Sequence, residues 1–140
     1  MTIHWAEQYI GIPWKRGATG PDTYDCLAFT EMIERKHFDT IMDVGKLFGL
    51  DWRDVDVNLL LATTPEYQKW LPASHPLEGD VVLMSYARDP IHIGVWINAN
   101  RTSGVLHCSE TNGVVFQTMS SLRRVGWGGF SYYTAKCKLQ

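Results

Sequence analysis

The sequence lacks the features that direct a chain into or across a membrane. The first residues, Met1 to Glu7, contain neither the basic segment nor the apolar run of a secretory signal peptide. No apolar stretch approaches the roughly 18 residues that a membrane-spanning helix needs. We therefore expect a protein that is made in the cytoplasm and has no membrane partner.

An excess of positive charge is also missing. The chain has 13 Lys and Arg residues against 15 Asp and Glu residues, which gives a formal net charge of −2. Proteins that bind nucleic acid normally carry a basic surface. The short pairs Arg35-Lys36 and Arg123-Arg124 are more typical of solvated edges. We therefore expect no nucleic-acid partner.

Cysteine is scarce and its positions are widely spaced. The three cysteines are Cys26, Cys108 and Cys137. An odd number without a signal peptide does not predict a disulfide framework, and the lack of a CxxC pair argues against structural zinc. We expect no bound metal and no cofactor, so each cysteine is either packed in the core or reactive.

The composition indicates one globular domain over residues 1–140, because 45% of the residues are hydrophobic and 20% are charged. The order of patterns along the chain predicts helices first and an antiparallel sheet second, which is an α+β fold. Helical spacing occurs over 3–10 and 26–33 and, in pieces, over an insertion at about 38–72; strand patterns occur at 81–84, 91–97, 104–108, 114–117 and 130–134.

The candidate nucleophile is Cys26. Its spacing with Phe29 and Ile33 predicts a helix, and Thr23 or Asp25 is suited to cap its start. Cys26 then lies in the first turn, where the helix dipole lowers the pKa of a thiol and backbone N–H groups can bind an oxyanion. A single cysteine on a helix is more often a core residue, so that interpretation remains open.

The candidate base comes from the strands. His92 and His107 lie in neighbouring predicted strands joined by a short turn, and an antiparallel pair brings two such side chains together. One histidine would take the thiol proton and the other would orient it. A structural role for both, or a metal site with Cys26 or Cys108, are the alternatives. Glu110 or Asn112 are alternatives to His107 as the orienting group.

Three sequence blocks resemble the NlpC-type cysteine peptidases, and they occur in the order found in that family. They are Tyr9-Ile10-Gly11-Ile12-Pro13-Trp14 with Tyr24-Asp25-Cys26, then Gly79-Asp80-Val81-Val82 leading to His92-Ile93-Gly94-Val95-Trp96-Ile97, and Val105-Leu106-His107 followed by Gly113-Val114-Val115. The blocks cover roughly residues 5–35 and 77–118.

The resemblance implies a papain-like α+β core in which Cys26 is the nucleophile, His92 the base and His107 the third polar residue. Members of this family cleave amide bonds in the stem peptides of bacterial peptidoglycan. By position, Asp25 lines the substrate cleft, or alternatively caps the helix. Trp14 stands where the family often has tyrosine, and we expect it to bind substrate or to wall the cleft.

The insertion at about 38–72 and the missing signal resemble the phage-borne branch of the family. That resemblance implies delivery by the virion, with tail-tip proteins as partners. Leu27-Ala28 follows the cysteine where the family usually has Ser-Gly. An inactive tail assembly protein with the same fold is therefore an alternative, as is another papain-like chemistry such as that of an amidase, deamidase or acyltransferase.

Overall fold

The computed structural model describes residues 4–42, 70–86 and 92–139. The helical elements are η1 (Trp5–Tyr9), α1 (Cys26–Phe38), α3 (Met119–Arg124) and η4 (Lys136–Leu139). The strands are β1 (Trp70–Ala73), β2 (Val81–Ser85), β3 (His92–Ala99), β4 (Thr102–Ser109), β5 (Gly113–Gln117) and β6 (Gly129–Ala135).

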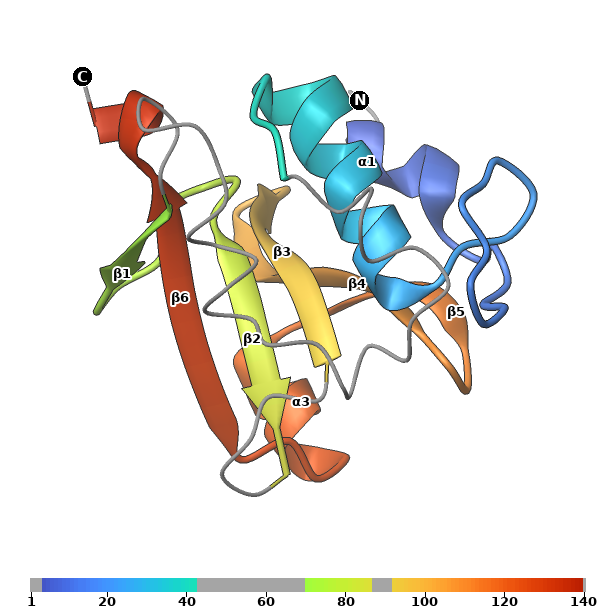
Figure 1. Ribbon diagram of the computed structural model, residues 1–140. Coiled ribbons are helices and arrows are strands. Elements are labelled where there is room, and N and C mark those ends of the chain that lie inside the picture. Colours follow the sequence, from blue (N-terminus) through green and yellow to red (C-terminus); the bar gives the residue numbers. More distant parts are fainter. Residues whose placement is uncertain (1–3, 43–69, 87–91, 140) are drawn as a thin grey trace.

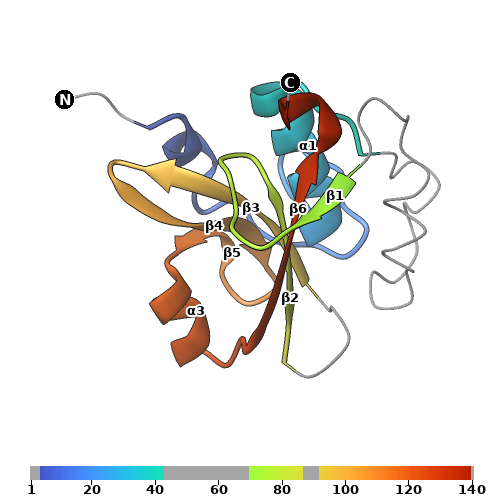
Figure 2. The ribbon, with the colours of Figure 1, turned by 90° about the vertical axis from the view of Figure 1, so that its left-hand side faces the viewer.

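The strands form one antiparallel sheet in the order β1-β6-β2-β3-β4-β5. Helix α1 covers one face of the sheet and the short helix α3 lies on the other (Figures 1 and 2). The predicted α+β fold is therefore confirmed, as are the five strands expected from the sequence. That residues 1–140 form one domain stays a prediction.

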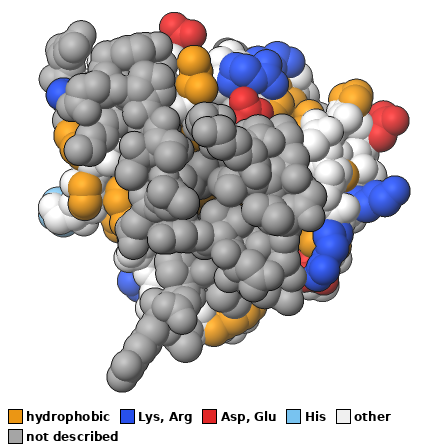
Figure 3. All heavy atoms as spheres, in the orientation of Figure 1, with side chains coloured by type: hydrophobic (Ala, Val, Ile, Leu, Met, Phe, Trp, Pro, Cys, Tyr) orange, Lys and Arg blue, Asp and Glu red, His pale blue; other side chains and the backbone are white. Residues whose placement is uncertain are grey.

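Helix α1 begins and ends where its sequence provides caps. The Asp25 side chain accepts a hydrogen bond from the Ala28 N–H, and Asp39 ends the helix in the left-handed conformation. Arg35 and Lys36 in the last turn complement the helix dipole. Lys and Arg side chains also gather over this part of the molecule in the space-filling view (Figure 3).

Each face of the sheet has its own apolar core. On the α1 face, Phe29 and Ile33 pack with Val95, Ile97 and Leu106, all of them fully buried. On the α3 face, the core cluster consists of Val82, Met84, Val105 and Leu122, with Trp127 and other aromatic side chains against it. Alternation along β2, β3 and β4 divides the residues between these two cores.

Two predicted helices differ in the structure. The N-terminal helix expected over 3–10 is a single 3-10 segment, η1. The helical pattern expected over about 38–72 is wrong at its C-terminal end, because Trp70–Ala73 forms β1 and pairs with β6. Pro72 is tolerated there because β1 is an edge strand of the sheet. Most of the predicted insertion, residues 43–69, lies outside the described residues.

Candidate functional site

The two histidines singled out in the sequence are directly hydrogen-bonded. His92 is the first residue of β3 and His107 lies near the end of β4, and His92 Nε2 is 2.7 Å from His107 Nδ1. Both side chains are buried, with 7% and 1% of their surface exposed. The prediction that an antiparallel strand pair brings them together is confirmed.

Gly94 provides the space that this close approach requires. A Cβ atom on Gly94 would lie 2.5 Å from Val105 Cγ1 and 2.9 Å from His107 Cβ. Real Cβ atoms do not come this close to their neighbours, so any side chain here would push β3 and β4 apart. The glycine of the His92-Ile93-Gly94 segment is therefore part of the site.

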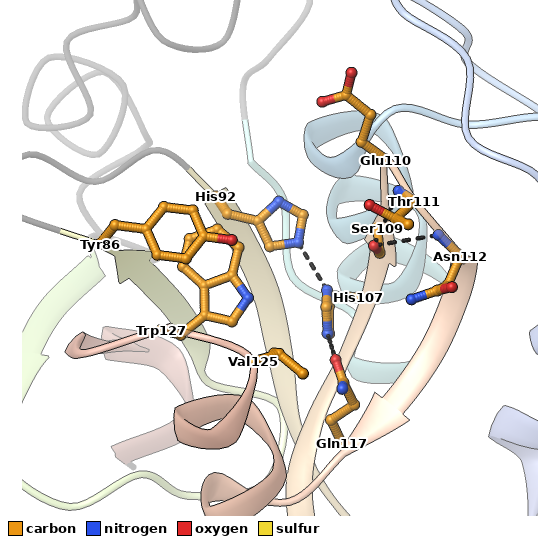
Figure 4. A pocket seen from close by; sticks show the side chains of 10 residues that line it. All are labelled: Tyr86, His92, His107, Ser109, Glu110, Thr111, Asn112, Gln117, Val125 and Trp127. Carbon is orange, nitrogen blue, oxygen red and sulfur yellow. Dashed lines mark hydrogen bonds between the residues drawn. The ribbon is translucent and has the colours of Figure 1, made fainter.

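A third polar side chain, Gln117, extends the pair. Gln117 Oε1 is 2.8 Å from His107 Nε2 (Figure 4). Gln117 Nε2 donates to Ser121 Oγ at 3.4 Å. Sequence reasoning missed Gln117. The available signal was its position on β5, two residues beyond Val115, which is paired with His107, so that Gln117 and His107 share a face.

Aromatic side chains hold the His92 ring from the other side. Trp127 stacks on His92 with ring centroids 5.3 Å apart and planes 17° apart. Tyr86 stacks in turn on Trp127 at 4.1 Å and 8°. Trp127 also packs against the core on the α3 face, so it contacts both that core and the candidate base.

A cavity of about 360 Å³ opens in front of these groups. His92, His107 and Gln117 line one part of it, Tyr86 and Trp127 lie beside them, and the polar turn 109–112 completes the described lining with Val125 (Figure 4). Glu110 and Asn112, the alternative orienting groups, are in this turn. The hydrogen bond to His92 is made by His107.

Burial sets the charge state of both histidines. It lowers the pKa of His92 well below its ordinary value, and the neighbouring His107 acts in the same direction. It lowers the pKa of His107 to about 4, with the hydrogen bond to Gln117 acting in the opposite direction. Both rings are therefore neutral near pH 7, and each carries one N–H.

Cys26 is the first residue of α1, as predicted, but its thiol is buried, with 6% of the residue exposed. Burial raises the pKa of Cys26 to about 12, helped by the Asp25 carboxylate and by Cys108, while backbone hydrogen bonds to Ile93 and Leu27 act to lower it. The expected lowering at the helix N-terminus is wrong for this state, because desolvation outweighs the favourable backbone groups.

The Cys26 thiol lies against β3 at Ile93, the residue that follows His92. Cys26 packs in a core cluster with Ile93 and Leu83. His92 is paired with Met84, whose side chain packs in the core on the opposite face. In the described part of the chain, no hydrogen bond joins the Cys26 thiol to either histidine. In the described residues, His92 is therefore hydrogen-bonded to His107, and Cys26 packs beside Ile93, the residue next to His92, without a hydrogen bond to either histidine.

The two predicted substrate-binding residues have structural positions. Asp25 Oδ1 accepts from the Ala28 N–H at 2.7 Å, so Asp25 is the N-cap of α1, and burial raises the pKa of its carboxyl. Trp14 is half-buried and packs against the core on the α1 face. Neither is among the described residues that line the cavity. Their role in binding substrate stays a prediction.

Cys108, for which the sequence left packing or reactivity open, packs in the core. It follows His107 in β4, points to the opposite face and is fully buried in the core under α1. Within the three described stretches of the chain, no three side chains of the metal-binding types form a group that could hold a metal ion. No helix in those stretches is long and apolar enough to cross a membrane.

No family model matches the sequence. A Listeria grayi protein named "Probable endopeptidase p60" is 24% identical over 127 residues, which are 89% of this chain and 20% of that protein. The chain therefore spans about a fifth of the length of this curated relative.

Solved structures show the same fold. The NlpC/p60 domain of the peptidoglycan hydrolase SagA aligns with a TM-score of 0.56 and 17% identity, covering 90% of each chain. An N-acetylmuramoyl-L-alanine amidase from Bacteroides uniformis aligns with a TM-score of 0.51 and 16% identity, covering 94% of this chain and 97% of that one. The chain thus has the papain-like α+β fold of NlpC/p60 domains, which the sequence predicted.

Proposed function

We propose that the protein is a cysteine hydrolase that cleaves amide bonds in the stem peptides of peptidoglycan. The observation that carries the proposal is the neutral, hydrogen-bonded pair His92–His107 on the wall of a cavity, one residue from the point where the Cys26 thiol meets β3. The likeness to a protein named an endopeptidase, and to the fold of a peptidoglycan hydrolase, supports this substrate class.

The chemistry would be acyl transfer through a thioester. His92 takes the Cys26 proton through Nδ1 while the sulfur attacks the amide carbon, and then returns that proton to the leaving amine. Water subsequently releases the acyl group and restores the thiol. Because the thiol has a pKa of about 12 when buried, it is not a standing thiolate. Proton transfer is therefore coupled to attack, and it requires substrate binding to bring Sγ within hydrogen-bond distance of His92.

Digestion of purified peptidoglycan tests this function. The wild-type protein is expected to release fragments with a new amine and a new carboxyl terminus, identified by mass spectrometry. Cys26→Ala and His92→Ala should release none. Cys137→Ala is the control for loss of a thiol, because Cys137 packs at the edge of the Cys26 core cluster but does not line the described part of the cavity, and it should keep most of the activity. Equal release by the wild type and Cys26→Ala would overturn the proposal.

The place of action is a further part of the proposal. We infer that the protein acts in a phage particle, with tail-tip proteins as partners, because the sequence stretch at about 38–72 resembles the phage-borne branch of the NlpC-type peptidases. Mass spectrometry of purified virions from an infected or induced host should detect the chain in the tail fraction. Its presence only in the soluble cell extract would contradict this inference.

A second candidate is a tail assembly protein that keeps the fold without catalysis. The burial of the Cys26 thiol, and the absence of a hydrogen bond between it and His92 in the described residues, favour it. The rate of alkylation by iodoacetamide at neutral pH separates the two. Alkylation of a catalytic Cys26 should slow in His92→Ala and when peptidoglycan fragments occupy the site, whereas a structural Cys26 should stay equally protected in every case.

A further inference from the structure

We propose that Gln117 is a positioning residue. It determines which ring nitrogen of His107 and of His92 carries the proton, and so leaves His92 Nδ1 unprotonated and able to accept one. The inference rests on the proposed function, in which His92 is the base. It follows from two hydrogen bonds that run in series from β5 through β4 to β3, His107 Nε2 to Gln117 Oε1 and His92 Nε2 to His107 Nδ1.

The first step is at the glutamine amide. A carbonyl oxygen can only accept a hydrogen bond, so Gln117 Oε1 at 2.8 Å requires a proton on His107 Nε2. The buried ring of His107 is neutral and carries one N–H. Nδ1 of His107 is therefore unprotonated and has a free lone pair.

The second step transmits this choice to His92. The unprotonated His107 Nδ1 accepts a hydrogen bond at 2.7 Å, so His92 Nε2 must carry the proton. His92 is neutral as well, and its Nδ1 is left bare. The bare nitrogen is the atom that a base needs, and in the described residues it has no hydrogen-bond partner.

The opposite orientation of the amide would have the opposite effect. If the Gln117 NH₂ group faced His107, every hydrogen bond of the series would reverse, and His92 Nδ1 would carry a proton it cannot exchange for the thiol proton. In the observed orientation, Gln117 Nε2 donates a second hydrogen bond to Ser121 Oγ in α3 at 3.4 Å, which keeps the amide beside His107. The Ser121 backbone is fixed in turn by the side chain of Thr118, the N-cap of that helix.

Two substitutions at one position separate this role from simple packing. Gln117→Glu keeps an acceptor toward His107 and should keep the same tautomers. Gln117→Leu has a similar size and offers no polar atom. It therefore removes the acceptor that keeps the proton on Nε2 of His107. Since Gln117 is half-buried at the end of β5, circular dichroism and thermal unfolding verify that both variants are folded.

The direct readout is the protonation of each ring nitrogen, measured by long-range ¹H–¹⁵N NMR on ¹⁵N-labelled full chain at pH 7. Resonances are assigned by removing the remaining histidines His4, His37 and His75 one at a time. We expect wild type and Gln117→Glu to carry the proton on Nε2 of both His92 and His107, and Gln117→Leu to show a mixture. A proton on His92 Nδ1 in wild type, or unchanged tautomers in Gln117→Leu, would overturn the proposal.

Kinetics supply the second readout. A wrong histidine tautomer costs about 10⁴-fold in kcat in a triad enzyme, so Gln117→Leu, which frees the choice, should lose roughly tenfold or more with little change in KM. Gln117→Glu should restore most of this rate, and its acidic limb should move to higher pH because a carboxylate raises the pKa of His107. If no variant or wild type hydrolyses peptidoglycan, the proposed function fails while the NMR result still decides the role of Gln117.

Discussion

Trp127 lies almost parallel to the ring of His92, with the two ring centroids 5.3 Å apart. The indole closes one side of the imidazole, while the hydrogen bond to His107 fixes its rotation. The ring of the candidate base is thus held both by a stacking contact and by a polar contact, from two different elements of the α3 side of the sheet.

Removal of this indole should expose His92 to water. In Trp127→Ala we expect the pKa of His92 to rise toward its ordinary value of 6.5, because burial is the first cause of its lowering. Trp127→Phe keeps an aromatic face and should shift the pKa much less. NMR titration of the His92 ring measures the effect, and an unchanged pKa in Trp127→Ala would show that other groups bury the ring.

A methyl group at Gly94 should destabilise the sheet at the site. In Gly94→Ala the new Cβ would meet Val105 and His107, so β3 and β4 must move apart. Overpacking of this kind costs roughly 1–3 kcal/mol of unfolding free energy. Gly128→Ala is the matched control, because a Cβ there meets nothing within 4 Å. Urea unfolding compares the two, and similar stability of both variants would contradict the prediction.

The buried carboxyl of Glu34 should make the protein less stable as pH rises. Burial raises the pKa of Glu34 to about 7 from 4.5, against the opposing effect of Lys138 at 3.4 Å. The folded state therefore holds the Glu34 proton more tightly than the unfolded state. The contribution of Glu34 to stability is greatest below pH 4.5 and is lost between pH 4.5 and 7, by roughly 3 kcal/mol at most.

Glu34→Gln tests this dependence. Unfolding free energies of wild type and Glu34→Gln are compared at pH 5 and pH 8, since their difference removes the effect of the histidines that titrate in the same range. The unfolding free energy of Glu34→Gln relative to that of the wild type should be higher at pH 8 than at pH 5. A difference that is the same at both pH values would mean that Lys138 keeps Glu34 ionised throughout.

Hydrolysis should persist at acidic pH. Because the pKa of His107 is about 4 and that of His92 is well below 6.5, the pair stays neutral far below the range in which an exposed histidine becomes charged. The acidic limb of the kcat/KM profile is therefore expected below pH 5. The measurement is peptidoglycan cleavage from pH 4 to 9, with circular dichroism to confirm folding, and a limb near pH 6.5 would contradict the burial of the pair.

Much of the sheet and half of the site could be predicted from the sequence. Alternation in β3 and β4 placed His92 and His107 together, because strand registers constrain side chains that are close along the chain. The polar neighbour Gln117 was missed, since a glutamine at the end of a short strand carries no pattern of its own. Gln117 lies beside His107 only because of the register in which β4 pairs with β5.

The state of Cys26 could not be predicted for a different reason. Its position at the start of α1 was readable from local spacing and from the Asp25 cap. Its burial depends on Met42, Trp70 and Ala135, which come from distant parts of the chain. For the same reason β1 was missed, because Pro72 argues locally against a strand and only the pairing with β6 makes it one.

The strand order has a consequence for how the protein assembles during synthesis. The hairpins β2–β3, β3–β4 and β4–β5 join neighbours in sequence, so the histidine pair and Gln117 can come together as soon as β5 has left the ribosome. β1 and β2 are connected only through β6, which is translated after all of them. Until β6 is present, β1 has no partner strand and β2 has one unpaired edge, and an unpaired edge of this kind readily associates with other chains.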